Sequence, residues 1–306
     1  MQYTVDEHFV PQFIIKRFSD SQEQVGIINV QQKKPVLRTT KSTAICYSKD
    51  MYEIKNVDGS YFERNCTEKR YAAIESELSS KINPVIEKLL LGGRLSGEDN
   101  AYLTVLFALQ LVRSSLLKRV IFKKDGLKHN IVRQLEQNSI YKMMIDSVDL
   151  GIQYLLQNGF VMNDEAIQQI RNAANHQKSM LDEVVQYIQK KCSFYVVTSY
   201  GHPFILSDNP VLIDKFDNAK YIFPIDPKYA IICAVRETDA NMDWGYLNSI
   251  EDDTVDEINY FSLQNADNLI VCQPDDKAYC LVLLQRVNHH KNNQNSKGDM
   301  QGAEKK

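Results

Sequence analysis

The chain has 306 residues, of which 43% are hydrophobic and 25% are charged, and its formal net charge at pH 7 is −3. This composition is that of a globular protein with a sizeable core, and it excludes fibrous and wholly disordered classes. The balance of 36 basic against 39 acidic residues also excludes the uniformly basic surface that accompanies non-specific nucleic-acid binding, although a local basic patch is compatible with it.

The sequence predicts a cytoplasmic protein with no membrane partner. The N-terminus has no basic lead followed by an apolar stretch, so we expect no secretory signal. The longest apolar run, Ala101 to Val112, is interrupted by Gln110 and is shorter than the roughly 20 residues that cross a bilayer. The six cysteines form no CxxC or Cys/His cluster, which indicates buried, reduced thiols rather than a zinc site or a disulfide framework.

Residues 1–287 are predicted to form a single compact α+β domain with three zones. The first zone, residues 1–66, mixes strands with one short helix. Pro11 suits the first turn of that helix because it lacks the N–H that would be orphaned there. Residues 25–30 and 35–40 have the pattern of a hairpin, and Asp58-Gly59 marks a turn.

The second zone, residues 67–192, is predicted to be helical. Thr67 is expected to cap a helix that is broken or kinked at Pro84. Ser96 and Asp99 resemble a capping box at the start of a helix over about 99–123. Further helices are expected at 129–145, at 148–157 and, as one longer helix, from Asn163 to about Lys190.

The third zone, residues 193–287, is predicted to be an antiparallel sheet interrupted by one helix over about 252–266. Its strands are expected where β-branched and aromatic residues are frequent, at 194–199, 204–206, 221–223, 230–235, 269–272 and 279–284. Residues 288–306 are polar and are predicted to form a disordered tail.

Several segments together carry a family resemblance. They are, in chain order, His8 to Phe13 with Lys16 to Phe18, Glu68 to Glu75, Phe107 to Gln110 with Arg113, Phe204 to Pro210, Phe223 to Ile225, and Asn259 to Ala266. In this order and span, about 8 to 275, the sequence resembles the bacterial family known as domain of unknown function 4238.

The resemblance implies a small stand-alone bacterial protein of a family in which some members are associated with defence against phage. By analogy, we expect an effector that acts on nucleic acid or on an essential metabolite. The prediction is therefore a nuclease, with RNA favoured over DNA as partner. The alternative is a non-catalytic module that senses or binds a phage-derived trigger or a nucleotide. The resemblance implies no particular cofactor.

His8, Asp208 and Asn209 are candidate site residues. His8 precedes the first helix, where a neutral imidazole could act as a general base or a metal ligand, but it could equally cap that helix or bond within the core. Asp208 and Asn209 follow a buried strand and precede Pro210, so their side chains are expected at the rim of the sheet. There Asp208 could bind a divalent metal or orient a histidine, or it could only close an Asx turn.

Gln110 and Arg113 are three residues apart on an apolar helix and share one face. Together they could contact a phosphate or a carboxylate, but a buried arginine also needs a structural partner, which Glu75 or Asp208 could supply. The interpretation we test is that His8, Gln110, Arg113, Asp208 and Asn209 converge on one polar pocket between the helices and the sheet.

A second constellation competes with this pocket. Arg171 to His176 fits the Arg, polar residue, three residues, His pattern of HEPN ribonucleases. That resemblance implies metal-independent cleavage, in which His176 moves a proton and Arg171 stabilises phosphate charge. Such sites are usually completed across a dimer, so it also implies a homodimer. The alternative is an exposed polar helix face.

Overall fold

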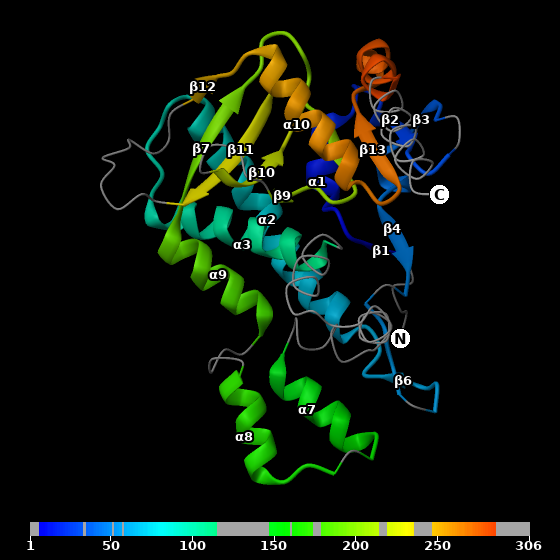
Figure 1. Cartoon of the computed structure of the whole chain (residues 1–306), viewed down its shortest axis with the longest axis vertical. Helices are drawn as coiled ribbons and strands as arrows, with labels where there is room; N and C mark the ends of the chain where they lie inside the picture. The colour runs from blue at the N-terminus through cyan, green and yellow to red at the C-terminus, as the bar shows by residue number, and fades with distance from the viewer. Residues whose placement is uncertain are drawn as a thin grey trace, which may run out of the picture.

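The computed structural model describes residues 6–32, 35–50, 52–56, 58–114, 147–159, 161–173, 179–213, 219–235 and 247–285. The predicted helix at 129–145 and the predicted tail at 288–306 lie outside these residues. The helix predicted over about 99–123 ends at Arg113, because Ser114 has extended backbone angles. The predicted α+β class is confirmed, because helices pack on two main sheets (Figure 1). Among the described residues, no helix is long and apolar enough to cross a membrane.

The first zone contains the predicted helix and hairpins. The helix is α1 (Gln12–Ile15), which begins directly after Pro11. The hairpin pairs β2 (Gln24–Asn29) with β3 (Leu37–Lys41) in antiparallel register. The predicted turn at Gly59, whose φ is +84°, joins β5 (Ile54–Lys55) to β6 (Tyr61–Phe62). A further short ladder joins β1 (Asp6–His8) to β4 (Tyr47–Lys49).

The helices of the second zone are α2 (Cys66–Leu90), α3 (Gly97–Arg113), α7 (Val148–Gln157), α8 (Asp164–Ala173) and α9 (Met180–Lys191). The capping box at the start of α3 is confirmed: the Asp99 N–H donates to Ser96 Oγ at 3.1 Å and the Ser96 N–H donates to Asp99 Oδ2 at 2.7 Å.

Three further boundaries in this zone were predicted wrongly. Helix α2 is capped by Asn65 in the left-handed region, and Thr67 lies inside its buried first turn. Of the two predicted alternatives at Pro84, the break is absent: the helix continues to Leu90, because buried apolar residues on both sides of the proline, such as Ile82 and Ile86, hold it in the core. The single helix predicted from 163 to 190 is two helices, because Ser179 has extended backbone angles and caps α9.

The larger sheet has the strand order β12 (Leu247–Ser249), β7 (Cys192–Thr198), β11 (Tyr229–Val235), β10 (Ala219–Pro224) and β9 (Leu212–Ile213). All its neighbours are antiparallel except β12, which runs parallel to β7. Alternate residues of β7 and β11 are buried on opposite faces, as expected for strands covered on both sides.

Helices cover both faces of this sheet. Phe194 and Ile231 on one face belong to the main core, together with residues of α2, α3 and α9. Val197 and Ile232 on the other face pack with residues of α10 (Asp252–Asn265). In Figure 1, α10 lies between the two sheets, and α7 and α8 form a pair at the lower end of the view.

The second sheet combines strands from the first and third zones of the chain. Its order is β3, β2, β13 (Leu269–Cys272) and β8 (Leu206–Ser207), and every pairing in it is antiparallel. The predicted first and third zones therefore share a hydrogen-bonded sheet.

The strand predicted at 279–284 is wrong, because residues 277–285 are helical. Cys280, Leu283 and Leu284 are buried against the second sheet at a spacing of three and four residues. This spacing places all three on one face of a helix, so burial outweighed the β-propensity of the segment.

Candidate functional site

Helices α2 and α3 hold the buried side chain of Arg113, which is only 6% exposed. Its guanidinium forms an ion pair with Glu75 and lies over the ring of Tyr71, 4.2 Å from the centroid, and over that of Tyr52 at 5.5 Å. The two tyrosine rings contact each other edge to face at 4.9 Å. Glu75 is thus the structural partner that a buried arginine needs.

Glu7 reaches the same tyrosines from strand β1. Its side chain is fully buried, and Oε2 accepts a hydrogen bond from the Tyr52 N–H at 2.6 Å. Burial raises the pKa of Glu7 to about 7, with a smaller contribution from nearby carboxylates and an opposing one from the Tyr52 N–H. We call Glu7, Tyr52, Tyr71, Glu75 and Arg113 the buried polar cluster.

Several polar atoms in and around this cluster lack a hydrogen-bond partner among the described residues. They include Oε1 of Glu7, Nε of Arg113, and both amide atoms of Gln110, whose side chain is fully buried one helical turn before Arg113. Each unsatisfied buried group costs about 1–3 kcal/mol, and such groups are rare away from functional sites. Four such atoms in and next to the cluster make it a candidate functional site, and other described residues, such as Gln12, also hold buried polar atoms without a partner.

His8 follows Glu7 but faces the other way. Successive side chains of a strand point to opposite faces, and the imidazole lies against Tyr47 of β4, with ring centroids 5.6 Å apart. The backbone of His8 contacts the cluster, since its carbonyl accepts a hydrogen bond from the Tyr52 hydroxyl at 3.1 Å, and the imidazole Nε2 is buried without a hydrogen-bond partner among the described residues. The helix that follows, α1, has four residues and so provides little of a helix dipole.

Asp208 and Asn209 are anchored by hydrogen bonds within the fold. The carboxylate of Asp208 accepts from the N–H groups of Asp267, Asn268 and Leu269, at 2.8, 2.7 and 3.0 Å. Burial raises the pKa of Asp208, and these three N–H groups oppose the shift. The Asn209 side chain donates to the carbonyl of Asn265 at 2.8 Å.

The structure brings some of the predicted residues together. Ser114 links two of them, because it follows Arg113 directly and its hydroxyl donates to Asn209 Oδ1 at 3.0 Å. Gln110 lies on the same helix one turn away. The carboxylate of Asp208, by contrast, is engaged at the start of β13, and the ring of His8 lies on the far side of β1.

The competing Arg171 to His176 constellation is described only in part. Arg171, on α8, donates from Nε and Nη2 to Asp149 of α7 at 3.0 and 2.8 Å, and its side chain is 49% exposed. His176 lies outside the described residues.

Sequence reasoning missed Glu7, Tyr52 and Tyr71. The available signal was alternation: in a strand next to His8, Glu7 occupies the position that faces inward. The described part of the chain contains no group of three or more His, Cys, Asp or Glu side chains that could hold a metal ion.

The fold and this cluster define an α+β protein with a buried ion pair between Arg113 and Glu75 and with a buried glutamic acid, Glu7, that is bonded to the backbone of Tyr52. The family described as protein of unknown function, DUF4238, matches residues 7–276, and the chain belongs to that family. No curated protein and no solved structure matches the chain.

Proposed function

We propose that this protein is a nuclease acting on RNA, a defence-type effector of the bacterial cytoplasm, and that the buried polar cluster is its reaction centre. The observation that carries the proposal is that Arg113 Nε and the whole amide of Gln110, one helical turn away, are buried and have no hydrogen-bond partner among the described residues. Natural proteins keep such costly groups where binding or chemistry uses them.

The residue types suit phosphodiester cleavage. Glu7, with a pKa of about 7, can donate or accept a proton at neutral pH. The guanidinium of Arg113 can stabilise negative charge on a phosphate, and the Gln110 amide can donate a hydrogen bond to a phosphate or ribose oxygen. Glu68, whose pKa is also raised by burial, is a second candidate for proton transfer.

The charges around Arg113 predict how such an activity would depend on pH. Glu68 and Glu75 lie near the Arg113 guanidinium, and Glu7 lies near Glu68, so if all three carboxyl groups were ionised they would repel a phosphate. Protonation of Glu7 below about pH 7 removes one of these charges. We therefore expect RNA cleavage to be faster at pH 6 than at pH 8.

The test is incubation of the purified protein with total RNA and with single-stranded DNA, with and without EDTA. We expect RNA cleavage that is lost in Glu7→Gln and in Gln110→Met, two variants that keep the size of the side chain. The pH dependence of any residual activity should no longer follow Glu7 in the first variant. Loss of RNA cleavage in His8→Ala would show that the His8 imidazole also takes part in the reaction, and inhibition of cleavage by EDTA would implicate a metal.

Two other outcomes would replace the proposal. Cleavage lost only in Arg171→Ala and His176→Ala would assign the activity to the HEPN-like helix, and a dimer in solution would then be expected. No cleavage, together with a rise in melting temperature on adding a nucleotide or a phage extract, would favour the sensing module, because a ligand stabilises the state that it binds.

A further inference from the structure

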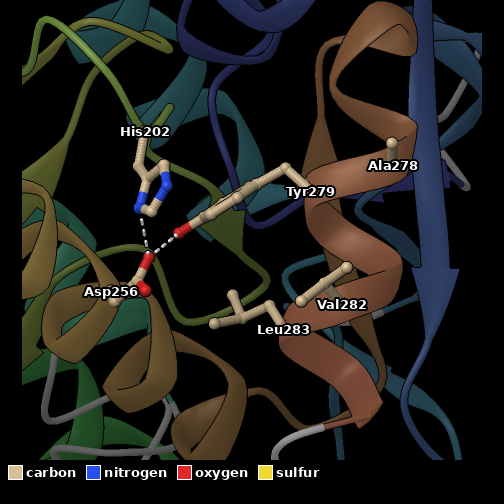
Figure 2. Close-up of a pocket in the computed structure, with 6 residues that line it drawn as sticks. All are labelled: His202, Asp256, Ala278, Tyr279, Val282 and Leu283. Carbon is tan, nitrogen blue, oxygen red and sulfur yellow. Dashed lines mark hydrogen bonds and ion pairs between the residues drawn. The ribbon is translucent and has the colours of Figure 1, made fainter.

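A second site lies on the other side of the second sheet, away from the buried polar cluster. It is a cavity of about 290 Å³ between α10, the loop before β8 and the helix at 277–285. Figure 2 shows the residues that line it. We call it the C-terminal pocket, and its lining is His202, Asp256, Ala278, Tyr279, Val282 and Leu283.

One edge of the C-terminal pocket is polar and highly ordered. Asp256 Oδ1 accepts a hydrogen bond from the Tyr279 hydroxyl at 2.6 Å and is 2.8 Å from His202 Nδ1 (Figure 2). Since a carboxylate can only accept, Nδ1 donates the hydrogen in this bond. The fully buried Asn259 donates to the Tyr279 oxygen at 2.8 Å and to the Pro203 carbonyl at 2.7 Å.

The loop that carries His202 is held in place by a second aspartate. Asp252 Oδ1 accepts from the backbone N–H of His202 at 2.9 Å, and the Ser199 hydroxyl donates to the His202 carbonyl. A Cβ atom at Gly201 would lie 2.2 Å from the Asp252 carboxylate, so a larger residue there would displace the Asp252 side chain from its bond to the loop. The position of the imidazole is therefore fixed by its backbone as well as by Asp256.

The opposite wall is apolar. Ala278, Val282 and Leu283 line it from the helix at 277–285, and Leu283 extends toward Asp256 (Figure 2). Val282 is 49% exposed, so the wall is open to solvent on one side. A ligand that fits both walls has an apolar body and one polar group.

The charges around the pocket indicate which charge the polar group of the ligand should carry. Residues 251–257 contain five carboxylates, and residues 275–277 contain two carboxylates and one lysine. The excess of negative charge draws cations to the pocket and disfavours phosphates and carboxylates. The Tyr279 ring packs on the imidazole of His202, with the ring centroids 4.9 Å apart, so both rings belong to this edge.

We propose that the C-terminal pocket binds a small organic cation, an amine whose ammonium group lies at the Asp256–Tyr279 edge and whose apolar body packs on Ala278, Val282 and Leu283. The proposal does not depend on the nuclease function. Four of the six lining residues lie beyond residue 276, where the family match ends, so the pocket is built in part by a segment that the match does not cover.

The test compares three probes of the same shape by NMR chemical-shift titration of the full chain: benzylamine, benzyl alcohol and benzoate. We expect benzylamine to bind with a dissociation constant on the order of 1 mM, as is typical for a fragment of this size. Benzyl alcohol should bind about tenfold more weakly, and benzoate should not bind. Equal binding of benzoate, or no binding of benzylamine, would overturn the proposal.

Three variants locate the binding. Asp256→Asn removes the charge at the polar edge and should weaken benzylamine about tenfold or more. Ala278→Phe fills the cavity from an exposed position and should abolish binding without disturbing the core. Asp253→Asn, the matched control, removes the same charge from an exposed position of α10 that does not line the pocket, and it should leave the affinity within about twofold. If Asp253→Asn weakened binding as much as Asp256→Asn, the pocket would be refuted as the binding site.

Discussion

Replacing Asp208 by asparagine should destabilise the protein more than any surface change of charge. The carboxylate accepts three backbone N–H groups at the start of β13, two of them at Oδ2 and one at Oδ1. An asparagine keeps one acceptor oxygen and places an NH₂ group where the other stood, so at least one bond is lost and two donors face each other. Hydrogen bonds to a charged group contribute about 1.5–3 kcal/mol each, so we expect a loss of about 2–4 kcal/mol in the free energy of unfolding.

The assay is urea denaturation followed by circular dichroism, with Asp58→Asn as the control. Asp58 also accepts from a backbone N–H, that of Ser60 at 2.9 Å, but it lies in an exposed turn, so the same substitution should leave the urea midpoint unchanged. A loss below about 0.5 kcal/mol in Asp208→Asn would show that the carboxylate is not needed as an anchor. That outcome would favour the hypothesis that Asp208 binds a metal or orients a histidine.

Three further predictions concern charged groups of the buried polar cluster and of the HEPN-like helix. The pKa of Glu7 is about 7 in the fold and 4.5 ordinarily, so the native state holds the proton more tightly than the unfolded chain. The free energy of unfolding should therefore fall by about 3 kcal/mol as the pH rises from about 4.5 to about 7, and it should not recover at higher pH. The melting temperature should fall over the same pH range, and Glu7→Gln should remove this contribution. Arg113→Ala leaves Glu75 without its ion pair and should cost about 3–5 kcal/mol in urea denaturation, whereas a cost below about 1 kcal/mol would contradict the buried pairing. Arg171→Ala breaks an exposed pair and should change stability by less than about 1 kcal/mol, and a larger loss would show that the pair holds α7 to α8.

The periodic and capping signals in the sequence were reliable where they acted locally. The Ser96 and Asp99 box, the turn at Gly59 and the helix at 148–157 lie where they were predicted, because each depends on residues a few positions apart. Local signals failed at Pro84 and at 279–284, where burial against distant parts of the chain outweighed the intrinsic preference of the segment.

The candidate site was only partly visible in the sequence. The pairing of Arg113 with Glu75 was among the structural options, because a buried arginine requires a partner. Glu7 was overlooked beside His8, since the direction of each side chain depends on the pairing of β1 with β4. The C-terminal pocket had no signal at all, because His202, Asp256 and Tyr279 come from segments far apart in the chain and meet only when α10 and the last helix pack together.

The sequence by itself determined the class of the fold, the positions of most helices and strands, and the family, since these follow from composition, periodicity and ordered local motifs. Only the tertiary structure decided that β2 pairs with β13, that Arg113 stacks on Tyr71, and that Asp208 anchors a backbone turn. The physical reason is that each of these contacts joins residues remote in sequence, and their partners are selected by the packing of the whole core rather than by any local preference.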